Sequence, residues 1–360
     1  MRKHPIETPD HPSMLALAAE LAEQANLGDS TDQWPAAQLE LCAKYGVFRW
    51  FLTQPWGGFD WPLADVIKGY LALSEACLTT TFIITQRTAA CRRLAASFNE
   101  PLKQELLPKL ASGKLFASVG ISHLTTSRLH MSQPVLRARP LGDGYVLDGY
   151  SPWVTGGKYC DWIVTGATLE DGRQILAAVP GDAPGVRCSA PAQLTALSAS
   201  CTGSVHFNEV LIPGAWLLDG PMESIMTKGT GGNTGGLETS TLALGLASAA
   251  ITFIEDESQQ RNYLTPASMA LREEQVALRY EILAVAAGKQ VCSNEDIRSR
   301  ANSLVLRSTQ SALAAAKGAG FVVGHPAGRW CREALFFLVW SCPQPVMQAA
   351  LCELAGLGSE

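Results

Sequence analysis

The chain has 360 residues, of which 47% are hydrophobic and 17% are charged. This composition excludes a disordered chain and a collagen-like repeat, and the length predicts two or three domains. The 28 basic and 33 acidic residues give a formal charge of −5, which excludes the basic surface that nucleic-acid binding requires.

Helical patterns dominate the first 110 or so residues. Apolar residues recur at helical spacing over 15–25, 35–45, 63–76, 88–98 and 102–110. Gly46 follows the second of these segments and predicts a left-handed residue at the end of that helix. The segment 51–62 is rich in Pro, Gly and Trp, so we expect a packed loop there.

The hydrophobic period changes from helical to alternating after Lys114. Short β-rich runs occupy 144–149, 162–165, 174–179 and 204–207, with Gly, Pro and Asp between them. This pattern predicts a small β-domain.

Long helical patterns return after a Gly/Thr-rich link. They cover 237–261, 268–290, 294–320 and 332–356, and four long helices in sequence favour an antiparallel bundle. The chain is therefore predicted to be an α+β multidomain protein. Its parts are an N-terminal helical domain (1–114), a central small β-barrel (115–222) and a C-terminal four-helix bundle (223–360).

The ten cysteines are scattered, without a C-x-x-C pair or a histidine at zinc-finger spacing. We expect reduced, mostly buried thiols and no metal site. The N-terminus has no signal-like apolar region, and no uninterrupted apolar stretch approaches the ~20 residues needed to span a bilayer. These observations predict a cytoplasmic protein without a membrane span.

Several short stretches carry motifs in a fixed order. They are 44–48 (K-Y-G-V-F) with 55–58 (P-W-G-G), 107–114 (L-P-K-L-A-S-G-K), 144–149 (G-Y-V-L-D-G) with 153–156 (W-V-T-G), and 200–203 (S-C-T-G) with 205–213 (V-H-F-N-E-V-L-I-P). Together they resemble the acyl-CoA dehydrogenase family over nearly the whole chain. The resemblance implies bound FAD, an acyl-CoA thioester as substrate, and a homodimer or homotetramer.

The resemblance assigns the flavin ring to the boundary between barrel and bundle. Trp153 would pack its indole against the isoalloxazine, and Thr155 would face the N5 and O4 edge. A planar ring needs a flat aromatic wall, and a hydride acceptor needs donors at its edge. The alternative is that Trp153 is a core aromatic of the β-barrel.

A second cofactor contact is implied for the loop 121–128. The family pattern (L/V)-T-E-P-x-x-G-S-D matches Ile121 at its start, Ser122 in place of Thr, and Ser127 at the loop Ser. His123 stands where the family has Glu. It is either a proton carrier near the flavin or a local hydrogen-bonding residue.

The bundle is expected to hold the diphosphate and adenine of an FAD bound mainly by a neighbouring subunit. Arg261 matches the Arg of the family's E-R-x-x-F-G turn, and an arginine suits a diphosphate. The alternative is that it closes a helix C-terminus. Gly318 matches the family's Gly-rich segment, in which the backbone comes close to the cofactor.

The usual catalytic base is missing. Acyl-CoA dehydrogenation needs a carboxylate to take the α-proton, and the family Glu in I-Y-E-G-T aligns with Ser341, whose hydroxyl is too weak a base without activation. Some relatives take the base from the start of the first bundle helix, where Gly235 is the match and Glu238 follows one turn later. Glu238 is therefore the candidate base. Its alternative role is to meet the dipole in the first helical turn.

Three functions follow from this pattern. The first is an FAD-dependent acyl-CoA dehydrogenase that uses Glu238 or another base. The second is a flavin-dependent monooxygenase of the same fold, which needs no α-carbon base. The third is a catalytically inactive family member with a binding or assembly role, which the eroded cofactor motifs favour.

Overall fold

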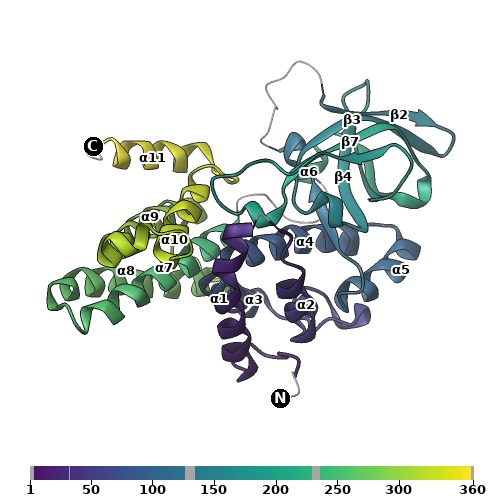
Figure 1. Ribbon diagram of the computed structural model, residues 1–360. Coiled ribbons are helices and arrows are strands. Elements are labelled where there is room, and N and C mark those ends of the chain that lie inside the picture. The colour runs from purple at the N-terminus through teal and green to yellow at the C-terminus, as the bar shows by residue number, and fades with distance from the viewer. Residues whose placement is uncertain (1–3, 32, 126–133, 229–235, 358–360) are drawn as a thin grey trace.

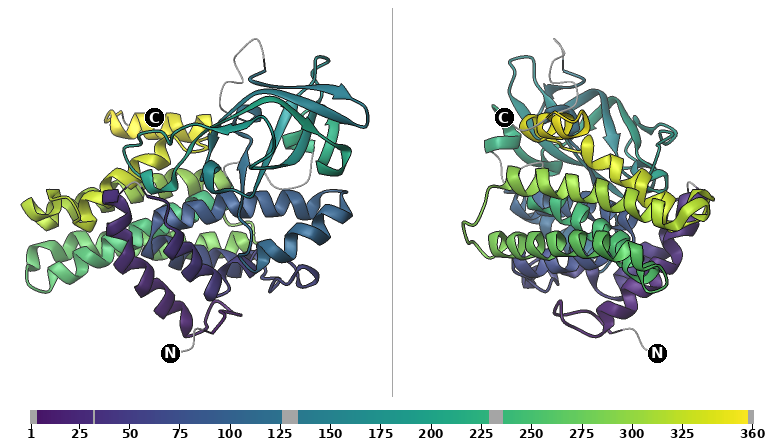
Figure 2. Two further views of the ribbon diagram at one scale, coloured as in Figure 1. Left: turned by 45° about the vertical axis from the view of Figure 1, so that its right-hand side comes forward. Right: turned by 90° about the vertical axis from the view of Figure 1, so that its left-hand side faces the viewer.

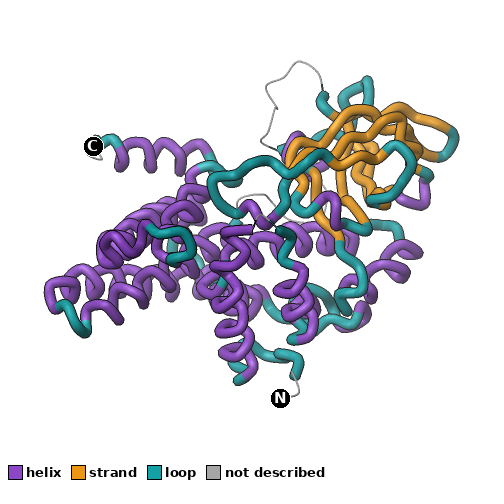
Figure 3. The backbone as a smooth tube through the Cα atoms, in the orientation of Figure 1, coloured by secondary structure: helices purple, strands orange, loops and turns teal. Residues whose placement is uncertain are grey.

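The computed structural model describes residues 4–31, 33–125, 134–228 and 236–357. Strands gather in one part of the molecule and helices form the rest (Figure 3). The N-terminal helices are α1 (Ser13–Thr31), α2 (Ala36–Lys44), α3 (Leu63–Ala76), α4 (Leu78–Ala96) and α5 (Glu100–Ala111). Gly46 has a φ of +76°, as predicted for the residue that ends α2.

Helix α4 begins ten residues before the predicted start at 88. The missed turns contain a run of β-branched residues, which lose side-chain freedom in a helix and weaken its sequence signal. Burial overrides this preference, because Thr81, Ile83 and Ile84 are fully buried. The prediction was therefore wrong at the part of α4 that packs deepest.

The strands form one curled sheet of eight. They are β1 (Ala117–Gly120), β2 (Leu136–Leu141), β3 (Gly144–Val154), β4 (Trp162–Thr168), β5 (Gln174–Pro180), β6 (Val186–Cys188), β7 (Gly203–Ile212) and β8 (Leu217–Met222). The strand order is β6-β7-β3-β2-β4-β5-β8, and β1 pairs in parallel with β4.

The sheet has a different partner on each face. One face encloses a core of its own, which includes Leu147, Ile163 and Phe207. The other face contributes residues such as Val164 and Leu176 to a cluster shared with α4 and α5. Alternate side chains of a strand point to opposite faces. One set therefore fills the sheet's own core, and the other set packs on the helical layer beneath the sheet (Figure 1).

The C-terminal helices are α6 (Ile225–Lys228), α7 (Leu237–Ser258), α8 (Thr265–Ala286), α9 (Asn294–Ala316), α10 (Pro326–Ala334) and α11 (Gln344–Leu354). Helices α7, α8 and α9 pack along one another, and α7 also packs on α3 (Figure 2). Among the described helices, α7 alone is long and apolar enough to cross a membrane. However, 72% of its apolar window is buried against the rest of the protein, as in a core helix.

The predicted helix over 332–356 is two helices. Helix α10 starts at Pro326 and passes into a 3₁₀ turn (Leu335–Leu338), and α11 starts only after Pro343. Pro343 lacks an N–H and cannot continue a helix, and Ser341 just before it has a φ of +45°. The backbone therefore leaves the helical path between the two helices.

Candidate functional site

A cavity of about 690 Å³ lies where the helices and the sheet meet. Its walls come from α3, α4, the end of β1, the end of β3, the loop before β7, the start of α7 and the segment after α10. Its lining includes Ile121, Ser122, Trp153, Thr155 and Glu238. Ser341 also lines it, so both candidate positions for a base open into one cavity.

Helix α4 supplies one wall through side chains at helical spacing. Phe82, Thr85, Ala89 and Arg92 lie on this stripe, and Arg93 borders it. The stripe spans about 15 Å from Phe82 to Arg92. It is apolar at its start and cationic at its end.

The apolar end is an aromatic cluster. Phe82 makes edge-to-face contacts with Phe336 and with Trp340, at centroid distances of 5.1 Å in both pairs. Phe336 and Trp340 stack on each other, also at 5.1 Å. All three line the cavity, so this end suits an apolar group.

The sheet presents an aromatic surface and hydroxyl groups to the cavity. The side chain of Trp153 is 48% exposed, so Trp153 is not a core aromatic of the barrel. Thr155 is buried, and its hydroxyl lies 3.0 Å from that of Thr202. The Ser122 hydroxyl is buried and has no hydrogen-bond partner among the described residues. An open indole beside an unsatisfied hydroxyl fits a planar ring with a polar edge.

Glu238 lies in the first turn of α7 and accepts a hydrogen bond from Arg92. Glu238 therefore has a partner on another helix, and it also lies at the positive end of the dipole of α7. Burial alone would lower the pKa of Arg92. The charges of Glu238 and Tyr70 have the larger combined effect, so the pKa of Arg92 is raised. Burial raises the pKa of Tyr70, which keeps this phenol neutral.

His123 is a local hydrogen-bonding residue. Its Nε2 lies 2.8 Å from the carbonyl oxygen of Gly166, and the side chain is 5% exposed. It is not among the residues that line the cavity. Burial lowers the pKa of His123 below its usual 6.5, although the Gly166 carbonyl opposes this shift.

This shift predicts a pH dependence of stability. The unfolded chain takes up a proton at His123 near pH 6.5, while the folded protein takes it up only at lower pH. The contribution of His123 to the free energy of unfolding is therefore complete above about pH 7 and decreases as the pH falls below 6.5. Urea unfolding of the wild type and of His123→Gln, which keeps a donor toward Gly166, measures it. We expect the wild type to lose stability relative to the variant between pH 7 and pH 5, and a constant difference would contradict this.

Arg261 and Gly318 lie away from the cavity. The Arg261 guanidinium donates to the carbonyl oxygen of Ala315 at 2.7 Å and pairs with Glu257. Gly318 is exposed, just beyond the end of α9. The structure thus places these two residues near the same end of α9. Ser127 lies outside the described residues.

Three arginines on the cavity wall were not predicted from the sequence. They are Arg92, Arg93 and Arg332. Arg92 and Arg93 look like the solvated end of an amphipathic helix when α4 is taken to start at 88. The sequence does contain a signal for Arg92, because Arg92 continues the stripe of Phe82, Thr85 and Ala89. This stripe can be recognised only when the helix is known to start at Leu78.

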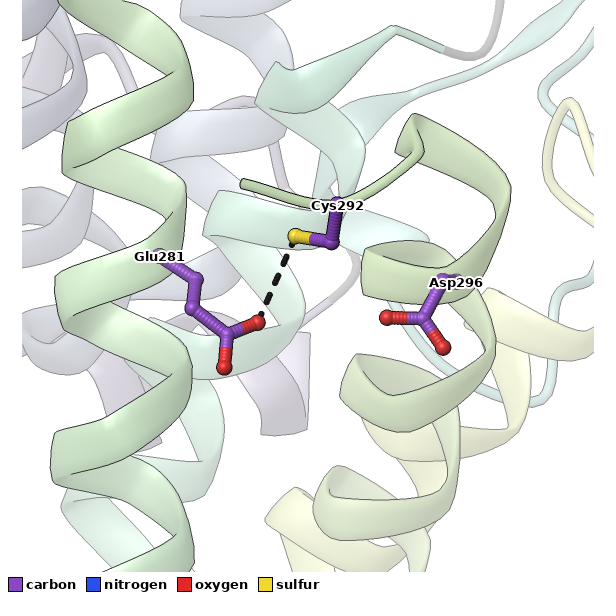
Figure 4. A group of neighbouring side chains, drawn as sticks. All are labelled: Glu281, Cys292 and Asp296. Carbon is purple, nitrogen blue, oxygen red and sulfur yellow. Dashed lines mark hydrogen bonds between the residues drawn. The ribbon is translucent and has the colours of Figure 1, made fainter. Parts of the chain in front are cut away.

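A second group of polar side chains lies between α8 and α9 (Figure 4). Glu281, Cys292 and Asp296 have ligand atoms within 4.8 Å of one another, and the Cys292 thiol donates to Glu281 at 3.4 Å. Arg300 pairs with Glu281 and lies 3.5 Å from Asp296. The guanidinium already supplies the cation here and lowers the pKa of Glu281, so the group is an ion-pair network that joins two helices.

Solved structures share this fold over almost the whole chain. Glutaryl-coenzyme A dehydrogenase, in a glutaryl-CoA complex, matches with a TM-score of 0.80 and 16% identity, over 97% of this chain and 96% of the other. Butyryl-CoA dehydrogenase from Megasphaera elsdenii matches with a TM-score of 0.79 and 17% identity, over 94% and 97%. FMN-bound TdsC from Paenibacillus matches with a TM-score of 0.78 and 16% identity, over 94% and 95%. These matches show that the chain has the fold of acyl-CoA dehydrogenases and confirm the predicted α+β fold class.

Curated proteins of similar sequence are named as acyl-CoA dehydrogenases. The probable acyl-CoA dehydrogenase YngJ of Bacillus subtilis is 27% identical over 245 residues, which are 64% of this chain and 62% of YngJ. The probable acyl-CoA dehydrogenase fadE25 of Mycobacterium leprae is 25% identical over 341 residues, 88% of this chain and 86% of the relative. No family model matches the chain. The chain is similar to acyl-CoA dehydrogenases over most of its length, and the resemblance inferred from its motifs is confirmed.

Proposed function

We propose that the protein is an FAD-dependent oxidoreductase that dehydrogenates an acyl-CoA thioester between its α and β carbons. The observation that carries the proposal is the sharing of one cavity by the Trp153 indole, the unsatisfied Ser122 hydroxyl and the Glu238 carboxylate. Bound FAD supplies the acceptor for the hydride that leaves the β-carbon. The protein supplies the wall, the hydrogen bonds and the base.

The residues have separate roles in this proposal. Trp153 holds one face of the flavin ring, and Ile121, Ser122 and Thr155 line its polar edge. Glu238 takes the α-proton on its carboxylate. The aromatic end of the cavity, around Phe82 and Trp340, keeps water away from the reacting carbons.

The rest of the cofactor extends toward a second copy of the chain. Arg261 and Gly318, which lie together beyond the cavity, then contact the diphosphate and adenine across the subunit boundary. This arrangement requires a homodimer or homotetramer, and the expected location of the enzyme is the cytoplasm. Arg261 suits this role because a guanidinium binds phosphate oxygens in pairs.

The proposal predicts that an acyl-CoA bleaches the flavin without oxygen. The purified protein, loaded with FAD, is mixed anaerobically with saturated acyl-CoA thioesters of increasing length, and the flavin absorbance is followed. At least one thioester is expected to reduce the flavin, with the corresponding enoyl-CoA as product. A protein that binds no flavin, or whose flavin no thioester reduces, contradicts the proposal.

Ser341 favours a second candidate, a flavin-dependent monooxygenase. It lines the cavity at the family's position for the base, and oxygen activation by reduced flavin needs no α-carbon base. The same preparation distinguishes the two functions. A monooxygenase consumes substrate and oxygen only when a reductase supplies electrons, and its flavin is not bleached by acyl-CoA alone.

A further inference from the structure

Trp34 packs directly on the turn that follows β3. This turn, residues 155–159, begins with Thr155, and its next residue, Gly156, has a φ of +64°. Only glycine adopts such a backbone conformation without cost. A Cβ built on Gly156 would also lie 2.5 Å from Cζ3 of the Trp34 indole. The indole therefore covers the backbone of the turn so closely that no side chain fits at position 156.

The Trp34 indole makes two further aromatic contacts. It stacks on Tyr159, at the other end of the turn, with ring centroids 4.8 Å apart and an angle of 7° between the planes. It meets Phe116, just before β1, edge to face at 5.2 Å. Trp34 itself lies between α1 and α2 and packs against the core of the helices. One side chain from the helical part of the protein thus contacts the turn at both ends.

Hydrogen bonds to the segment before β7 hold the turn from another side. The Thr155 hydroxyl lies 3.0 Å from the Thr202 hydroxyl, which in turn lies 2.8 Å from the Ser200 hydroxyl. The Gly156 N–H donates to the carbonyl oxygen of Ser200 at 3.0 Å. The turn is therefore held between the indole and this hydrogen-bond network.

We propose that Trp34 is a positioning residue that orients the Thr155 hydroxyl toward the polar edge of the flavin ring. This inference rests on the function proposed above. Among the described residues, Thr155 and Thr202 line the cavity and Trp34 does not, so Trp34 acts on a bound ring only through the turn. A hydrogen bond requires a narrow range of distance and angle, and a turn without its support on the helical side loses that geometry.

Trp34→Ala tests the proposal with FAD itself as the ligand. Binding of FAD to the purified full chain is measured by calorimetry, and the absorption spectrum and reduction potential of the bound flavin are recorded. We expect about threefold to tenfold weaker binding, the size of one hydrogen bond. The potential should become more negative, because donors at the ring edge stabilise the charge that the ring gains on reduction. A role in folding alone would not change the spectrum or the potential of the flavin that is bound.

A second substitution tests whether the effect passes through the turn. Gly156→Ala places a methyl group against the indole of the wild type, whereas the shorter ring in Trp34→Phe makes room for it. The strain of the positive φ is the same in both backgrounds and cancels in the comparison. We expect Gly156→Ala to weaken FAD binding more in the wild type than in Trp34→Phe. Equal losses in both backgrounds would contradict an action through the turn.

Trp216→Ala is the matched control. Trp216 is half-buried like Trp34, packs against the core of the sheet and meets Trp162 edge to face at 6.1 Å. It is not among the described residues that line the cavity, so its loss should leave FAD binding, spectrum and potential unchanged. Urea unfolding of both variants compares their stability and separates a change at the flavin from a general weakening of the fold.

Two further results overturn the inference. One is a Trp34→Ala protein that binds FAD as tightly as the wild type, with the same spectrum and potential. The other is a Trp216→Ala protein whose bound flavin changes as much as that of Trp34→Ala. A wild type whose FAD no thioester reduces contradicts the dehydrogenase function and leaves this test intact, because none of its measurements requires a substrate.

Discussion

Glu238→Gln is expected to slow flavin reduction by the best acyl-CoA about 10²- to 10⁴-fold, the usual contribution of a positioned general base. Glutamine has the shape of glutamate and still accepts the hydrogen bond from Arg92, so the wall of the cavity keeps its form. What is lost is the carboxylate that accepts the α-proton. Stopped-flow absorbance under anaerobic conditions measures the rate, and calorimetry shows whether the thioester still binds.

A control separates this effect from a general loss of charge. Glu170→Gln removes an exposed carboxylate after β4 and should leave the bleaching rate within twofold of the wild type. Equal rates for Glu238→Gln and the wild type, at equal thioester binding, would mean that another group takes the proton.

Ser341→Glu offers a rescue of the Glu238→Gln protein. Position 341 opens into the same cavity and is where the family resemblance expects the base. Ser341 has a φ of +45°, a conformation that Glu adopts at about the same cost as Ser, since neither is Gly or Asn. We therefore expect the double variant to regain part of the lost rate. A rescue shows that the cavity needs a carboxylate and that its walls present the α-carbon to both positions.

The motifs picked out Trp153 and Thr155, which line the cavity, because these motifs are local. Trp153 and Thr155 sit two residues apart at the end of β3, so their shared position follows from one strand and the turn after it. The order of helices and strands also followed from periodicity, since hydrophobic spacing changes clearly after Lys114. Whether Trp153 and Thr155 bind FAD stays a prediction.

The helical wall of the cavity could not be predicted in the same way, because it is assembled from distant segments. Arg92 meets Glu238 across 146 positions of sequence, and nothing local marks either residue as a partner of the other. The first turns of α4 are helical because their side chains are buried, although their β-branched residues have a low helix propensity. When these turns are missed, Arg93 looks like a residue at the solvent-exposed end of a short helix. The break before α11 was missed because an apolar run surrounds Pro343 and hides the proline's effect.

Arg298→Met is expected to lower the free energy of unfolding by about 2–4 kcal/mol, because it strips buried acceptors of their donors. Arg298 is 1% exposed on α9. It donates to Asn302 at 3.0 Å, to the Phe337 carbonyl at 3.2 Å and to the Trp340 carbonyl at 2.9 Å. Burial lowers the pKa of Arg298 to about 10, so the charge persists at neutral pH and strengthens these bonds.

The same side chain positions the wall of the cavity. Trp340 and Ser341 line the cavity next to the break between α10 and α11, and the Trp340 carbonyl is one of the groups that Arg298 holds. A loosened segment should weaken binding of the acyl-CoA and leave the flavin content unchanged, since Trp153 and Thr155 come from the sheet.

Arg300→Met is the matched control, because Arg300 lies on the same helix but is 40% exposed and pairs with Glu281. Its loss should cost less than about 1 kcal/mol. Urea unfolding measures both variants. Equal effects of the two substitutions would show that Arg298 is an ordinary helix residue, whereas a larger loss for Arg298 together with weaker thioester binding ties the cavity wall to one buried arginine.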